Sequence, residues 1–151
     1  MSMLKGILAI SGKPGLFKLI TNAKNSIIVE SLLDGKRMPA YATSKISSLE
    51  DISIYTIDDD VKLADVFISI FEKDVKVNPK KASSDELKKT FKEVLPDYDD
   101  ERVYVSDIKK VFTWFNLLKE KGIISQESIE EYNKAKESEE VDEEKENSNN
   151  E

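Results

Sequence analysis

The sequence predicts an α+β protein with a small N-terminal β-barrel, a helical C-terminal domain and a disordered acidic tail. Three observations predict this architecture. Up to Thr56 the chain consists of short runs in which apolar and polar residues alternate between turn residues, which is typical of strands. From Asp60 to Lys136 apolar residues recur at helical spacing, as in helices that bury one face. From Glu137 onward apolar residues are almost absent, so this segment cannot join a core and is expected to be disordered.

Four strands are predicted in the first part of the chain, over Ile7–Ser11, Leu16–Thr21, Ser26–Leu32 and Arg37–Ala42. The first two are joined by the turn Gly12–Gly15, where a proline fixes φ and a glycine accepts a positive φ. Asp34-Gly35 predicts a tight hairpin before the fourth strand. Pro39 places that fourth strand at an edge of the sheet, because proline has no N–H to donate.

A fifth strand completes the predicted barrel. Ser44–Asp51 lacks alternation and predicts a single helical turn, and Ile52–Thr56 then alternates again. Five short strands, with a tight hairpin before the fourth and a helical turn before the fifth, resemble an SH3-type barrel of the kind found in Tudor and KOW modules. Such a barrel of about 50 residues has a core too small to be stable alone, so another element should pack on it.

The element expected to pack on the barrel is a helix over Asp60–Asp74, whose apolar residues form one stripe. Val75–Ser83 follows as a linker, because it contains Pro79 and several polar residues. We therefore expect residues 4–74 to form the barrel with its packing helix, and residues 75–83 to be the boundary between two domains.

Residues 84–136 are predicted to form the helical domain. Its helices are expected over Ser84 to just before Pro96, over Ser106–Lys121 and over Ser125–Lys136. Gly122 ends the second and longest of them, after lysines that suit the negative end of a helix. Residues 137–151 are the predicted disordered acidic tail.

The net charge of −7 is distributed unevenly along the chain. Residues 138–151 contain seven acidic residues and one lysine, whereas the first 50 residues contain seven basic and three acidic ones. The head of the chain is therefore basic and its end acidic, which is more informative than the overall charge. The acidic tail is expected to act as a solubilising segment; the alternatives are that it mimics nucleic acid or masks the basic head.

The composition argues against most kinds of enzyme. The sequence contains no cysteine and no histidine, which excludes disulfides, thiolate metal sites and the usual general base near neutral pH. The acidic residues cluster at helix starts and in the tail, so we expect no catalytic activity and no cofactor. No window is apolar enough for a membrane span or a signal peptide, which predicts a soluble, cytoplasmic protein without a membrane partner.

Several segments resemble an uncharacterised two-domain family of Bacteroidetes proteins. The segments similar to its first domain are Leu4–Lys18, Val29–Leu32, Pro39–Ala42 and Lys45–Ile52. Those similar to its helical second domain are Arg102–Tyr104 and Ser106–Lys110. The resemblance extends from about Leu4 to Ile124, leaves out the tail, and implies no activity.

Eight residues are candidates for contact with a partner: Lys13, Phe17, Lys18, Lys24, Arg37, Tyr41, Lys45 and Trp114. The basic ones are expected in loops or on outward faces of the barrel, close to aromatic residues, where phosphates and bases can bind. The opposing interpretation is that Phe17 belongs to the core and that the lysines are ordinary surface residues. Trp114 lies off the main apolar stripe of its helix, so it is either an anchor for a partner or buried between the two domains.

Two motifs are interpreted as turns rather than sites. Gly12–Gly15 lacks the spacing, the hydroxyl residue and the following helix of a phosphate-binding loop. Asp97–Glu101 resembles half of a calcium loop, but Arg102 and Ile108 occupy the positions that need glycine and glutamate.

These observations favour a non-catalytic cytoplasmic binding or adaptor protein. Its partner would be another protein or a ribonucleoprotein assembly, contacted through the barrel loops and the Ser106–Lys121 helix. The alternative is a factor that binds RNA or DNA directly through the basic barrel loops. Direct binding to phosphates would weaken steeply with added salt, whereas a protein partner would depend on a few aromatic anchors. The sequence predicts no particular oligomeric state.

Overall fold

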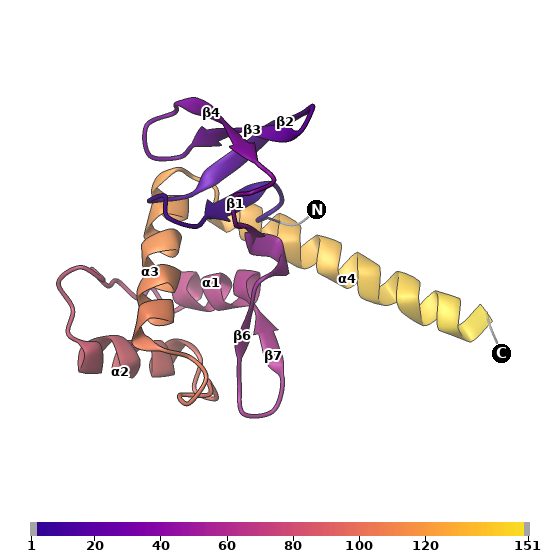
Figure 1. The fold of residues 1–151 in the computed structure, drawn as a ribbon. Coiled ribbons are helices and arrows are strands. Elements are labelled where there is room, and N and C mark those ends of the chain that lie inside the picture. Colours follow the sequence, from indigo (N-terminus) through magenta and orange to yellow (C-terminus); the bar gives the residue numbers. More distant parts are fainter. Residues whose placement is uncertain (1–2, 150–151) are drawn as a thin grey trace.

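The chain folds as a β-sheet stacked on a group of helices, with one long helix extending away from both (Figure 1). The computed structural model describes residues 3–149, with side chains over residues 3–138. The strands are β1 (Ile7–Ile10), β2 (Phe17–Ala23), β3 (Ser26–Ser31), β4 (Arg37–Tyr41), β5 (Ile46–Ser48), β6 (Ser53–Tyr55) and β7 (Asp60–Lys62). The helices are η1 (Leu49–Asp51, a 3-10 helix), α1 (Leu63–Glu72), α2 (Ser84–Val94), α3 (Val105–Glu120) and α4 (Gln126–Asn149). The predicted α+β class is therefore confirmed.

Strands β1 to β5 form an antiparallel sheet in the order β4-β3-β2-β1-β5. Two of the connections between the first four strands are the turns that the sequence predicts. Gly12 and Gly15 adopt φ values of 82° and 75° between β1 and β2, and Gly35 adopts 74° before β4. These values lie in the left-handed region that glycine enters without a steric penalty. The predicted meander of four strands is therefore confirmed.

The sheet is open, and the predicted closed SH3-like barrel is not observed. In the part of the chain that the structure describes, β4 and β5 are the two edges and do not pair with each other. β5 contains only three residues, and the chain then turns into η1, where Leu49 is fully buried among the helices. Because the chain leaves the sheet to bury this leucine, no further strand is available to close the barrel.

The predicted fifth strand belongs to a second, two-stranded sheet. Ile52–Thr56 does form a strand, β6, but β6 pairs with β7 and not with the first sheet. The position beside β1 is taken instead by β5, in the segment Ser44–Asp51 that was predicted to be a helical turn; only its end, η1, is helical. The turn between β6 and β7 is held by Thr56, whose N–H donates to the carbonyl of Asp59 at 3.1 Å and whose hydroxyl accepts from the N–H of Asp59 at 3.0 Å.

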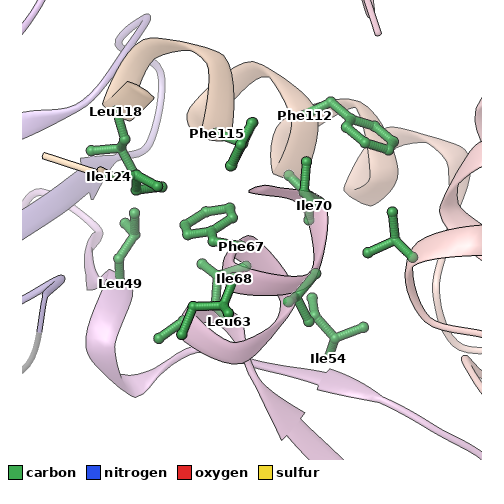
Figure 2. Packing of buried hydrophobic residues seen from close by; sticks show 14 of the residues in the cluster. Leu49, Ile54, Leu63, Phe67, Ile68, Ile70, Phe112, Phe115, Leu118 and Ile124 are labelled. Atoms are coloured by element: carbon green, nitrogen blue, oxygen red, sulfur yellow. The ribbon is translucent and has the colours of Figure 1, made fainter. Parts of the chain in front are cut away.

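The helices bury most of the apolar residues of the molecule, in a cluster that we call the helical core. Phe67 of α1 lies at its centre, facing Phe115 of α3 with 6.1 Å between the ring centroids (Figure 2). Leu49 reaches the same cluster from η1 and lies near Leu118 and Ile124 (Figure 2). The helix over Asp60–Asp74 is therefore confirmed, although it begins at Leu63 because Asp60–Lys62 forms β7.

A second, smaller cluster lies within the sheet, and we call it the sheet core. Its buried residues are Leu8, Ile10, Phe17, Val29 and Ala40. Successive residues of β1 point to opposite faces, so Leu8 and Ile10 belong to the sheet core while Ile7 joins the helical core. Strand β1 therefore connects the two clusters.

The segment between α1 and α2 follows the surface of the helical core. Val75 and Val77 pack against the core, and the side-chain amide of Asn116 on α3 donates to the carbonyl of Val77 at 2.9 Å. Helix α2 begins after Ser83, whose hydroxyl accepts from the N–H of Glu86 at 3.2 Å. The division into domains at residues 75–83 stays a prediction, although the helical core contains residues from both sides of this segment.

Helix α4 continues past the residue where the sequence predicts its end. Ile129 is buried in the helical core, and Lys136 Nζ lies 3.4 Å from the carboxylate of Asp65 on α1. The backbone then continues as a helix to Asn149, whereas the sequence predicts disorder from Glu137. Glutamate and lysine are good helix formers, so the composition of the segment favours helical geometry.

Candidate functional site

A groove lies where the first sheet, β6 and α3 meet. It consists of two adjoining hollows, both lined by Ile52, Lys110 and Trp114. The first, which we call the Lys13 hollow, has a volume of about 480 Å³ and lies against the β1–β2 turn and β5. The second, which we call the Arg102 hollow, has a volume of about 250 Å³ and lies between β6 and the start of α3. The groove therefore joins segments from three separate parts of the sequence.

Helix α3 supplies the shared wall. Its start is capped by Asp107, whose carboxylate accepts from the N–H of Tyr104 at 3.0 Å. The N-cap residue is therefore Tyr104, and the helix begins at Val105, one residue before the predicted range Ser106–Lys121. Lys110 and Trp114 are four residues apart and so lie next to each other on one side of the helix. Trp114 is half-buried: it packs against the helical core and also lines the groove.

The basic residues of the Lys13 hollow are free to bind an anion. Lys13, Lys45 and Lys110 are exposed and line the hollow, and none forms an ion pair with a carboxylate among the described residues. The N–H of Ser11 donates to the carbonyl of Lys45 at 2.9 Å, which holds the β1–β2 turn beside the start of β5. Lys13 Nζ lies 3.7 Å from the sulfur of Met38, a weak acceptor. Asp107 also lines the groove, but its carboxylate is engaged in capping α3.

Arg102, by contrast, is engaged within the molecule. Its Nε lies 2.8 Å from a carboxylate oxygen of Asp99, and its Nη2 donates to the carbonyl of Thr56 at 3.1 Å. The guanidinium also lies over the ring of Tyr55, 4.4 Å from the centroid. The hydrogen bond from Arg102 lowers the pKa of the Asp99 carboxyl, and the same bond raises the pKa of Arg102. Through these contacts Arg102 holds the loop before α3 against the end of β6.

Three of the predicted contact residues come together in the groove, namely Lys13, Lys45 and Trp114. Lys110 was not among the eight candidates; it lies four residues before Trp114 and completes the cluster. The only signal for Lys110 was this helical spacing from a tryptophan that lies off the main stripe.

The other predicted contact residues lie outside the groove. Phe17 is 4% exposed and belongs to the sheet core, so its ring cannot contact a partner in this structure. Lys18 is an exposed cross-strand neighbour of Glu30, and Arg37 pairs with the same carboxylate at 3.6 Å. Lys24 lies in the turn between β2 and β3, and Tyr41, which is 55% exposed, lies at the end of β4.

Other kinds of site have no residues gathered for them in the described chain. Among the described residues, no three acidic, cysteine or histidine side chains converge in a way that would hold a metal ion. Of the helices searched in the same part of the chain, none combines the length and the apolar character that a membrane crossing requires.

Comparison with known proteins places the chain in a family. Two family models match it, both described as domains of unknown function: DUF5606 over residues 4–49 and DUF6852 over residues 52–118. A solution NMR structure from Bacteroides vulgatus, solved by the Northeast Structural Genomics Consortium, is similar with 48% sequence identity and a TM-score of 0.68. The match covers 81% of this chain and 89% of that one. The chain belongs to this family.

The predicted membership of an uncharacterised two-domain Bacteroidetes family is thereby confirmed. The two DUF models meet at η1, where the chain leaves the first sheet, whereas the sequence analysis places its boundary at residues 75–83. A comparison with curated proteins finds no match. The DUF5606 and DUF6852 matches carry no assigned activity, so a function for the groove has to be argued from its chemistry.

Proposed function

We propose that this chain is a non-catalytic cytoplasmic binding protein that holds a segment of a partner protein, free or within a ribonucleoprotein assembly, in the groove. One observation carries the proposal: Lys13, Lys45, Lys110 and Trp114, from distant parts of the sequence, line one concave surface. An arrangement with a half-buried tryptophan at the centre and unpaired cations around it suits a peptide with both apolar and acidic residues.

The chemistry of the groove supports a protein partner. Ile52, Val111 and Trp114 give it apolar walls, which can bury apolar side chains of a partner. Trp114 is already packed against the helical core, so its ring loses little conformational freedom when a partner binds. The three lysines provide attraction and orientation at the rim, where charged groups contribute more to association rate and specificity than to affinity.

Affinity capture with charge-matched variants tests this proposal. The bait is the full chain, as the wild type, as Lys110→Glu, as Trp114→Ala, or as the control Lys24→Glu, which makes the same charge change outside the groove. We expect proteins that wild type and Lys24→Glu retain, that resist nuclease treatment, and that both groove variants lose. Retention of the same proteins by the two groove variants would place the binding surface elsewhere and reject the proposal.

Direct binding of RNA or DNA is the second candidate function. It is supported by the same unpaired lysines together with Trp114 and Tyr55, which could bind phosphates and stack on bases. If it is correct, capture is lost after nuclease treatment and affinity for an oligonucleotide falls steeply with salt. The changes Lys13→Ala, Lys45→Ala and Lys110→Ala should then weaken binding by similar factors, since each removes one phosphate contact.

We also propose that the open sheet is a variant of the SH3-type barrel. Support comes from the four-strand meander with β5 returning beside β1, and from the sheet core enclosed by these strands. Amide–amide nuclear Overhauser effects between β1 and β5 in solution would support this arrangement of the strands. Their absence, with the other strand pairs visible, would reject it.

A further inference from the structure

The outer edge of β6 presents unpaired backbone groups to the Arg102 hollow. In the hairpin of β6 and β7, Leu63 N–H donates to the carbonyl of Ile52, and Thr56 N–H donates to the carbonyl of Asp59. Hydrogen bonding alternates along an antiparallel strand, so Ser53 and Tyr55 direct their backbone groups away from β7. No described residue bonds to the N–H or the carbonyl of Ser53, or to the N–H of Tyr55.

The other half of the same edge is already paired. The N–H of Ile57 donates to the carbonyl of Asp97 at 2.9 Å, and the N–H of Asp99 donates to the carbonyl of Tyr55 at 3.0 Å. Residues 97–99 thus lie on this edge like a short antiparallel strand, with a bridge between Thr56 and Tyr98. After Asp99 the chain turns away, and the edge is open from the Tyr55 N–H toward Ile52.

We infer that an extended peptide segment binds by adding a strand to this open edge. The inference rests on the proposed function and specifies how the groove would hold its partner. Main-chain hydrogen bonds to Ser53 and Tyr55 would continue the pairing that residues 97–99 begin, as in other cases of strand addition. Alternate side chains of the segment would enter the Arg102 hollow, where Val103, Val111 and Trp114 line the wall, so these positions are apolar.

The direction in which β6 runs predicts the charge of the bound peptide segment. Ser53 and Tyr55 line only the Arg102 hollow, whereas Ile52 lines both hollows, so a strand following β6 past Ile52 enters the Lys13 hollow. There it meets the unpaired lysines described above, which suit a run of acidic residues. Nucleic acid offers no main-chain amides to this edge, so it cannot continue the backbone pairing. We therefore assign the groove to an extended segment with alternating apolar residues and an acidic end.

Ser53→Pro removes the edge donor without disturbing the hairpin. The N–H of Ser53 faces away from β7, and its side chain is exposed. Ile52 has φ −83° and ψ 134°, a conformation that the residue before a proline readily adopts. Ser53→Ala is the matched control, because it removes the hydroxyl and keeps the N–H. Both variants should show the circular dichroism spectrum and the melting temperature of the wild type to within a few degrees.

Fluorescence anisotropy with designed peptides tests the inference. The probes are fluorescein-labelled peptides of about eight residues, with threonine alternating with valine, leucine or phenylalanine and a run of glutamates at either end. We expect the best probe to bind wild type and Ser53→Ala equally, and to bind Ser53→Pro about tenfold more weakly. Methylating the backbone amides of the probe at odd or at even positions should abolish binding in only one of the two series, because alternate amides face the edge.

The outcomes separate this inference from the proposed function. Equal affinity for wild type and Ser53→Pro, together with weaker binding to Lys110→Glu, overturns strand addition and leaves the binding groove in place. Failure of every probe to bind wild type also overturns strand addition, while the capture experiment still reports on the groove. Binding of a single-stranded oligonucleotide that Lys110→Glu and Trp114→Ala abolish, with no binding of any peptide, rejects both.

Discussion

The two cores of this molecule differ greatly in size, and the difference indicates where its stability resides. Among the described residues, the helical core contains 23 buried apolar residues and the sheet core five. Phe67, Phe91, Phe112 and Phe115 are all fully buried in the helical core, whereas Phe17 is the largest side chain of the sheet core. A core as small as that of the sheet is marginal by itself. The sheet therefore depends on the helices for its stability.

The groove lies where these two regions meet. Ile10, which lines the Lys13 hollow, belongs to the sheet core, whereas Val111, which lines the Arg102 hollow, belongs to the helical core. A partner in the groove would therefore contact both regions and stabilise their packing against each other. The following predictions test whether the two regions differ in the way that their cores suggest.

Phe67→Ala should have the largest effect. The ring is fully buried at the centre of the helical core, and its removal is expected to lower the free energy of unfolding by about 3–5 kcal/mol. Urea denaturation followed by circular dichroism measures this loss. Phe71→Ala is the control, because Phe71 lies on the same helix but is only half-buried. A loss as small as that of the control would contradict the central place of the helical core.

Phe17→Ala should have a smaller and more local effect. The sheet core has few other large residues and can partly collapse, so we expect a loss of about 2–3 kcal/mol. Hydrogen exchange should accelerate at the amides of β2 and β3 while those of α1 and α3 keep their protection. Equal acceleration in helices and strands would show that the two regions unfold as one unit.

Gly15→Ala tests the turn between β1 and β2. Gly15 has φ 75°, and an added Cβ would lie 2.7 Å from the side chain of Leu33. Leu33 is exposed and can move, so the backbone conformation dominates and the expected loss is about 1 kcal/mol. Thermal denaturation measures it, with Ser47→Ala on β5 as a control. A gain in stability would mean that the turn tolerates a different backbone conformation.

The pH dependence of the Asp99–Arg102 contact is the smallest predicted effect, because the contact lies at the surface, where the Arg102 side chain is 51% exposed and that of Asp99 21%. The pKa of the Asp99 carboxyl is lower in the folded state than in the unfolded one, so its contribution is present above the unfolded value and is lost as the pH falls through the folded value. Wild type should therefore be more stable than Asp99→Asn at neutral pH, and the difference should shrink as the pH falls below the ordinary pKa of an aspartate carboxyl. Urea denaturation across this range checks the trend, with Asp100→Asn as a control. A difference that stays constant with pH would contradict it.

The sequence predicted the elements that local patterns determine. Alternation and turn residues placed β1 to β4, and helical spacing placed α1, α2 and α3, because each of these elements has one buried face. The family was predicted from segments such as Leu4–Lys18, which lies within the residues that match DUF5606.

The remaining elements depend on contacts that no local pattern shows. Strand β5 contains two serines in three residues and is a strand only because β1 lies beside it. Asp60 was predicted to begin the helix over Asp60–Asp74, but it pairs with Tyr55 in the second sheet. The closed barrel was predicted because the burial of Leu49 among the helices cannot be read from its neighbours in the sequence.

The sequence predicted three residues of the groove but not that they would lie together. Lys13, Lys45 and Trp114 were singled out separately, as a loop lysine, another loop lysine and an off-stripe tryptophan. That they share one hollow with Lys110 depends on the docking of α3 against the end of the sheet, which is a property of the tertiary structure. The opposite environments of Phe17 and Lys13 correspond to the opposing interpretation, in which Phe17 belongs to the core and the lysine lies on the surface.

Leu49 has a consequence for how the two halves of the family relate to each other. It is the last residue matched by DUF5606, yet its side chain lies inside the helical core, most of whose buried residues match DUF6852. If the polypeptide were cut between the two matches, one fragment would contain a cavity in its core and the other would expose Leu49 to solvent. The two matched segments are therefore expected to occur together in one protein. Expressed as separate fragments, they are expected to fold only after they are mixed.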